Sequence, residues 1–159
     1  MTGTTFRDEG MVSLAGAFDS GARTVMLRGW VGTDAGDVAL AYAAGKAREG
    51  KVLVIAPTIL HSQVRRRLEE AAPGVAVGEW GDPDAAIELV STPRAGRDAG
   101  LRDPVTFGLV VVEENHEPFH GHARQARARF TGAAFVEVVR MPHPHQGALD
   151  HDAEVHVGH

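Results

Sequence analysis

Runs of β-branched residues alternate with helical stretches along this chain, and this alternation limits the fold more than any other feature of the sequence. Strands that alternate with helices are typical of α/β domains with a mainly parallel sheet. The pattern predicts strands over residues 24–28, 51–56, 75–77, 84–91, 107–112 and 134–140. It predicts helices over residues 35–49, 58–72 and 120–130, and a loop over residues 93–104. We therefore expect one three-layer α/β sandwich over residues 1–142.

The last segment, residues 143–159, is rich in histidine. We expect it to form a weakly ordered tail or to add an edge strand over residues 153–157. Its histidines are also candidate ligands for a transition metal.

The composition excludes several classes of protein. The chain of 159 residues has no cysteine, which excludes disulfide bonds, thiolate zinc sites and thiol nucleophiles. Its formal net charge of -5 argues against nucleic-acid binding over the whole surface. No apolar run reaches the roughly 18 residues that span a membrane, and the first residues lack the basic and apolar segments of a signal peptide. We therefore expect a cytoplasmic protein.

Four motifs follow one another along the chain. A glycine-rich turn in LRGWVGTDAGDVALAY (residues 27–42) joins a predicted strand to a helix. KVLVIAPT (residues 51–58) and ELVSTPR (residues 88–94) place threonine and proline after a predicted strand, and GLVVVEENHE (residues 108–117) ends one in acidic residues. In this order the motifs resemble those of the first RecA-like lobe of superfamily 2 helicases, closest to the primosomal replication-restart helicases.

The resemblance implies a RecA-like P-loop fold, with ATP and Mg as cofactors and single-stranded DNA as a partner. It also assigns a role to each matching position. The matching residues are Thr33, Asp34, Gly36 and Asp37 in the phosphate loop, Thr58, Thr92 and Arg94 as contacts to the DNA backbone, and Glu113, Glu114 and His116 at the metal and the attacking water.

The phosphate loop departs from the pattern GxxxxGK[ST] that binds nucleotides. If Gly36 is its last glycine, Val31 replaces the first glycine, Asp37 the lysine and Val38 the hydroxyl residue. Two like charges about 4 Å apart repel by roughly 4 kcal/mol at an effective dielectric constant near 20, so Asp37 would repel a phosphate. Asp34 is instead a candidate N-cap, which puts both carboxylates at the positive end of the helix. We therefore expect an eroded loop, no bound cofactor and no catalysis.

The acidic motif leaves a second function open. Carboxylates at the end of a central parallel strand lie at the edge of the sheet where ligands usually bind. Glu113 and Glu114 are therefore candidate magnesium ligands in an active nucleotide-binding ATPase, with His116 beside them. The alternative for the same residues is a pair of solvated acids at a strand end.

The histidines leave a third function open. His116 to His120 match the pattern HExxH, with His122 two residues beyond. On a helix this pattern holds zinc and supplies a general base, as in metal-dependent hydrolases. Pro118 lies between the first two histidines, and proline inside a helix costs about 3 kcal/mol. The sequence therefore disfavours one helix across the pattern.

Taken together, the motifs predict a pseudoenzyme that kept a helicase-like fold and lost its chemistry. A helicase motor needs ATP between two lobes, and this chain matches one lobe only. We expect an assembly or regulatory module whose partner is another protein or a second copy of the chain. A DNA-associated role follows from the resemblance alone.

Overall fold

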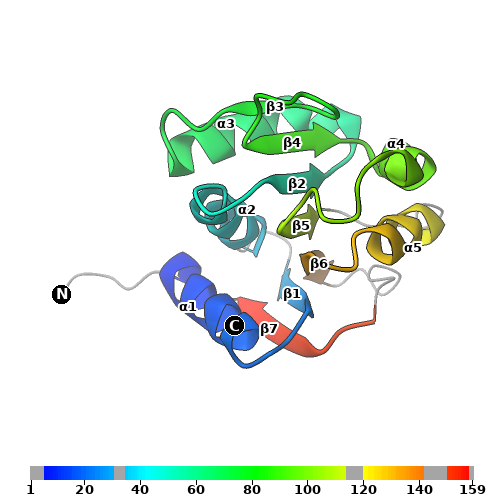
Figure 1. Cartoon of the computed structure of the whole chain (residues 1–159). Coiled ribbons are helices and arrows are strands. Elements are labelled where there is room, and N and C mark those ends of the chain that lie inside the picture. Colours follow the sequence, from blue (N-terminus) through cyan, green and yellow to red (C-terminus); the bar gives the residue numbers. More distant parts are fainter. Residues whose placement is uncertain (1–5, 31–34, 114–119, 142–149, 158–159) are drawn as a thin grey trace.

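A computed structural model describes residues 6–30, 35–113, 120–141 and 150–157. Within these residues one sheet lies between two layers of helices (Figure 1). Its strands are β1 (Thr24–Trp30), β2 (Val52–Ile55), β3 (Val77–Glu79), β4 (Ile87–Val90), β5 (Leu109–Val112), β6 (Ala134–Met141) and β7 (Ala153–Val157). The helices are α1 (Phe6–Asp19), α2 (Ala35–Lys46), α3 (His61–Ala71), α4 (Thr92–Asp98) and α5 (His120–Arg129), with short 3-10 turns η1 (Thr58–Leu60) and η2 (Ala99–Leu101).

All seven described strands run parallel, in the order β3-β4-β2-β5-β6-β1-β7. The predicted fold class is confirmed: the domain is a three-layer α/β sandwich of the RecA-like type. Parallel strands bury both faces under helices, which explains why β2, β4 and β5 are fully buried.

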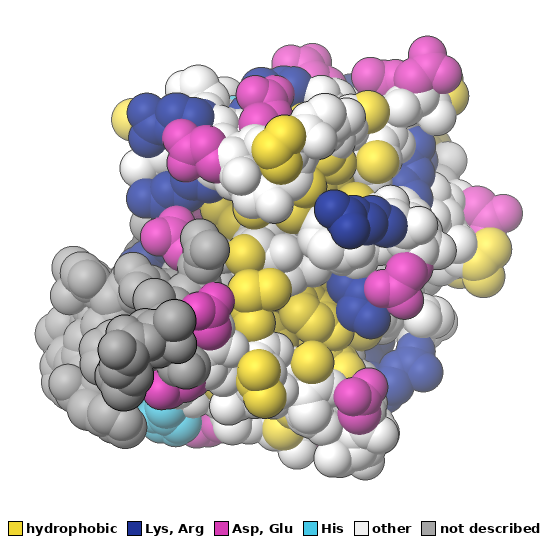
Figure 2. All heavy atoms as spheres, turned by 90° about the vertical axis from the view of Figure 1, so that its left-hand side faces the viewer, with side chains coloured by type: hydrophobic (Ala, Val, Ile, Leu, Met, Phe, Trp, Pro, Cys, Tyr) yellow, Lys and Arg dark blue, Asp and Glu magenta, His cyan; other side chains and the backbone are white. Residues whose placement is uncertain are grey.

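Helices α1, α2 and α3 cover one face of the sheet (Figure 1). Helix α2 is rich in alanine and its Val38, Ala39 and Leu40 are almost fully buried, so it packs closely between its neighbours. Helix α3 buries Val64 and Leu68, which are four residues apart as the apolar stripe predicts. Figure 2 shows this face, where hydrophobic side chains remain visible between the helices.

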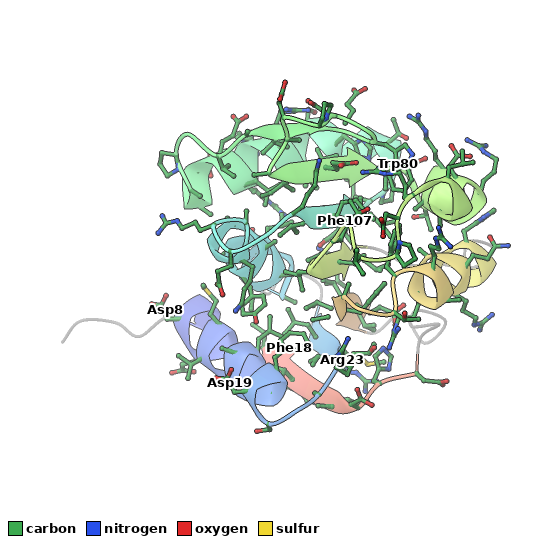
Figure 3. The ribbon with its side chains drawn as sticks, in the orientation of Figure 1. Asp8, Phe18, Asp19, Arg23, Trp80 and Phe107 are labelled. Atoms are coloured by element: carbon green, nitrogen blue, oxygen red, sulfur yellow. The ribbon has the colours of Figure 1, made fainter. Side chains whose placement is uncertain are left out.

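Helices α4 and α5 cover the other face. Phe107 and Phe130 meet there edge to face, with their ring centroids 5.1 Å apart. Trp80 lies against Phe107 at 6.4 Å, at the edge of this second core (both are labelled in Figure 3). This second core is smaller and more aromatic than the first.

The prediction of a loop over residues 93–104 is wrong. This segment contains α4 and η2. Pro93 stands in the first turn of α4, where proline costs no hydrogen bond. Gly96 lies at the crossing with α5 and permits close packing, so neither residue breaks the helix.

The two ends of the chain add a helix, α1, and an edge strand, β7. No helix was predicted before residue 24, yet α1 packs against β7 and α2. The edge strand proposed for residues 153–157 is confirmed as β7, which pairs with β1. Part of the predicted tail therefore belongs to the sheet. None of the described helices is long and apolar enough to cross a membrane.

Candidate functional site

The carboxyl ends of the parallel strands gather at one edge of the sheet, which we call the carboxyl edge. Gly36 lies beyond β1, Thr58 follows β2, Arg94 follows β4 and Glu113 follows β5. Ligands of open parallel sheets usually bind at this edge. The structure therefore brings the described parts of all four motifs to the same edge.

Glu113 is the buried centre of the carboxyl edge, with 2% of its surface exposed. Its backbone N–H donates to the Ile55 carbonyl oxygen at 2.8 Å, which extends the sheet ladder beyond β5. Its Oε1 atom accepts a hydrogen bond from Nη2 of Arg140 in an ion pair. Arg140 lies near the end of β6, the strand between β5 and β1, so the pair reaches towards the start of α2.

Gly36 packs directly on this ion pair. It is the second residue of α2, and a Cβ built on it would lie 3.1 Å from Glu113 Oε1 and closer still to Arg140 Nη2. The N-terminus of such a helix is where a phosphate loop holds its anion. Here the Arg140 guanidinium and the Glu113 carboxylate fill the space beside that helix turn.

Asp37 lies in the first turn of α2, as predicted, but its partner is a side chain of another helix. Its Oδ1 atom is 3.4 Å from Nε of Arg67 on α3, and both side chains are partly exposed. This pair joins α2 to α3 at the surface. The residue that the sequence motif matched to the loop lysine thus serves a contact between helices.

Several predicted site residues lie outside the described part of the chain. These are Thr33, Asp34, Glu114 and His116. The predicted N-cap at Asp34 and the predicted catalytic role of Glu114 stay predictions.

The three predicted DNA contacts follow neighbouring strands but differ in exposure. Thr58 is exposed at the start of η1. Thr92 is buried at the start of α4, so its hydroxyl does not face solvent. Arg94 is half exposed, and its Nε lies 3.4 Å from Oδ2 of Asp98 in the same helix. Thr58 and Arg94 therefore remain the accessible members of this set.

The histidines that match HExxH are only partly described. Helix α5 begins at His120, and His116 lies outside the described residues. His122 is half-buried, and its backbone meets α4 at Gly96. No group of three or more potential metal ligands occurs within the described ranges.

A separate hollow lies at the opposite edge of the sheet, where β2, β5 and β6 begin. It has a volume of about 280 Å³ and is lined by Phe18, Tyr42 and Lys46 among others. The rings of Phe18 and Tyr42 stack at 5.7 Å (Phe18 is labelled in Figure 3). Burial raises the pKa of Tyr42, although the charge of Lys46 opposes the shift. Lys46 is itself 3.4 Å from Glu49, so its ammonium already has a partner.

Sequence analysis missed Arg140 and Arg67, the two arginines that pair with the acidic residues of the motifs. Neither belongs to a recognisable motif. The one available signal is the position of Arg140 in AFVEVVRM, where a charge stands near the end of a largely apolar strand. Its partner depends on the order of the strands in the sheet, which that signal does not contain.

No protein-family model and no curated protein sequence matches this chain. What the carboxyl edge can do therefore follows from its own residues.

Proposed function

We propose that this chain is a non-catalytic domain of helicase descent that acts as a protein assembly or regulatory module. One observation carries the proposal: the ion pair between Glu113 and Arg140 packs against Gly36, at the turn where a phosphate loop would hold its nucleotide. Asp37, in the place of the loop lysine, is paired with Arg67. The described charges of Asp37, Glu113 and Arg140 are thus paired within the fold.

The energy of the ion pair argues against nucleotide binding at this edge. Removing one partner from a buried ion pair costs about 3–5 kcal/mol, because the remaining charge stays in a poorly solvated place. A ligand with a dissociation constant near 1 mM gains about 4 kcal/mol in total. A nucleotide that had to draw Glu113 away from Arg140 for its magnesium would therefore lose most of a millimolar affinity.

A protein partner suits the surface better than a small ligand does. On α1, Met11, Ala15 and Phe18 are only partly buried against the core, and Val12 is 74% exposed. Hydrophobic side chains also gather between the helices in Figure 2. Exposed apolar surface of this kind is found where proteins meet.

Single-stranded DNA is a weaker candidate partner. Arg94 and Arg97 both lie within 3.4 Å of Asp98, which offsets their charge. Salt-dependent binding of a labelled oligonucleotide, lost in Arg94→Ala, would make DNA the partner.

The test of the proposed function is a calorimetric titration of the protein with Mg-ATP. We expect no saturable heat at millimolar nucleotide and no ATP turnover. The matched variants are Glu113→Gln, which breaks the buried pair, and Glu69→Gln, which removes an exposed charge on α3. Saturable binding that Glu113→Gln abolishes and Glu69→Gln preserves would overturn the proposal in favour of an ATPase that uses Glu113 with magnesium.

A further inference from the structure

Strand β7 forms one edge of the sheet, and its backbone has a defined outward side. The Phe135 N–H donates to the Arg23 carbonyl oxygen at 2.8 Å, so the odd-numbered residues of β1 face β6, and Met26 and Arg28 face β7. Met26 lies opposite Glu154 and Arg28 lies opposite His156, so the groups of β7 that bond to β1 belong to Ala153, Val155 and Val157. Because backbone groups alternate in direction along a strand, Glu154 and His156 direct their N–H and C=O groups away from the sheet. No other described strand pairs with this side.

The opposite edge of the sheet, at β3, is protected against pairing with another strand. Strand β3 has three residues, and Nη1 of Arg65 donates to the carbonyl oxygen of Val77 at 2.5 Å. Proteins protect free edges with short strands and charged side chains of this kind. Strand β7 is longer, contains no proline or lysine, and has no such side chain on its outward carbonyls among the described residues.

The side chains of β7 divide between the two faces of the sheet. Val155 and Val157 are buried under α1, where a Cβ on Gly10 would lie 3.3 Å from Cγ2 of Val157. Glu154 and His156 lie on the other face, with 45% and 61% of their side chains exposed. Oε1 of Glu154 is 3.7 Å from Nη2 of Arg28 on β1. The edge therefore presents one acid and one histidine, two residues apart.

We propose that two copies of this chain pair through β7, antiparallel and about a two-fold axis at Val155. In this register Val155 faces Val155 of the second copy, and Ala153 faces Val157. Glu154 faces His156 in the same register, and both carry outward N–H and C=O groups, so the seam has about four backbone hydrogen bonds. The result is one continuous sheet through both copies, a known mode of strand addition.

The polar side chains on β7 fit this register and this partner. Glu154 of one copy stands opposite His156 of the other, and the two-fold axis repeats the pair. These positions are hydrogen-bonded to each other, and the Cβ atoms of residues directly opposite each other lie about 4.5–5.5 Å apart, close enough for their side chains to interact. The strand is therefore complementary to a copy of itself. The inference does not depend on the ion pair at the carboxyl edge, so it can fail without affecting the proposed function.

Sedimentation equilibrium of the full chain, from about 1 to 500 μM, tests the proposal. We expect the wild type to be a reversible dimer within this range. The variant His156→Glu puts two acids opposite each other at both ends of the seam, and we expect its dimer to be about ten- to a hundred-fold weaker. Both side chains are exposed, and circular dichroism checks that the variant still folds.

The charge-swapped double variant separates the register from a general charge effect. Glu154→Lys combined with His156→Glu places a lysine opposite a glutamate across the seam, and we expect a dimer within about three-fold of the wild type. Glu69→Lys on α3 has the same change of charge as Glu154→Lys and should leave the dimer unchanged. A wild type that stays monomeric, a dimer insensitive to His156→Glu, or a double variant as weak as the single one would each overturn the proposal.

Discussion

Glu88 places a carboxylate in the interior of the fold. It lies on the buried strand β4 and is fully buried. Arg102 donates two hydrogen bonds to its carboxylate at 2.8 and 2.7 Å, Lys51 lies at 2.9 Å, and the Gly81 N–H donates at 2.7 Å. Arg102 also stacks on Trp80, 4.5 Å from the ring centroid. Four contacts thus hold one buried charge, as burial of a carboxylate requires.

This network makes the stability of the protein sensitive to acid. Burial alone would raise the pKa of Glu88, but the hydrogen bonds from Arg102, Gly81 and Lys51 outweigh burial and hold that pKa below its usual value. A carboxylate with a lowered pKa stabilises the fold above its ordinary pKa, and this contribution is lost as the pH falls through the folded value. We expect Glu88→Gln to lower the free energy of unfolding by about 2–4 kcal/mol at pH 7. When the pH falls below about 4, the free energy of unfolding should decrease less in the variant than in the wild type.

Urea denaturation at a series of pH values measures this effect. Glu79→Gln, an exposed change on β3, serves as the control and should follow the wild type. Equal stabilities of Glu88→Gln and Glu79→Gln at pH 7 would contradict the role given to the buried carboxylate.

The ion pairs between side chains were the hardest feature to predict from the sequence. The motif that contains Glu88 predicted a contact to DNA at Arg94, and nothing in it indicated that Glu88 binds Arg102 and Lys51. The same holds for Glu113 and Arg140. Each of these contacts joins residues that only the order of the strands and the path of the loops bring together.

At the scale of elements, the crossing of α4 and α5 depends on a residue without a side chain. A Cβ on Gly96 would lie 2.5 Å from His122 Cα and 2.7 Å from its carbonyl oxygen. Backbone atoms cannot turn aside as a side chain can. We expect Gly96→Ala to destabilise the protein by about 1–3 kcal/mol, as overpacking does.

A second glycine provides the matched control for this change. Gly45 lies inside α2, and a Cβ there would meet nothing within 4 Å. Because alanine has a higher helix propensity than glycine, Gly45→Ala should stabilise the fold by about 0.5–1 kcal/mol. Thermal denaturation of both variants distinguishes them, and a neutral or stabilising Gly96→Ala would show that the helices can separate at little cost.

The strands were easier to predict than the helices. Runs such as KVLVIA and FGLVVV identified β2 and β5 because parallel strands are buried on both faces and need continuous apolar sequence. Helix α4 was missed because Pro93 and Gly96 are read as breakers, although one suits a first turn and the other a helix crossing. Helix α1 was missed because its glycines and serine give little helical preference, and its packing on β7 and α2 supplies the stability.

At the scale of the whole molecule, alternation of strands and helices predicted the fold class but not the residues that meet at the carboxyl edge. The order of motifs placed Gly36 and Glu113 at the same edge, and the structure adds the arginine between them. What the sequence could not supply is the register of β7 on β1, which decides the side that its backbone groups face.

The melting temperature links the assembly of the molecule to its stability. If folded copies pair through β7 and unfolded copies do not, a rise in protein concentration favours the folded state by mass action. At about 0.7 kcal/mol of unfolding enthalpy per residue, a hundred-fold rise in concentration should raise the melting temperature of the wild type by about 2–5 °C. The melting temperature of His156→Glu should change much less, and millimolar Mg-ATP should shift neither protein. Calorimetric scans at two concentrations, with and without nucleotide, measure both effects together. A melting temperature that rises with nucleotide but not with protein concentration would contradict both, because it would require a bound ligand at the carboxyl edge and a free edge at β7.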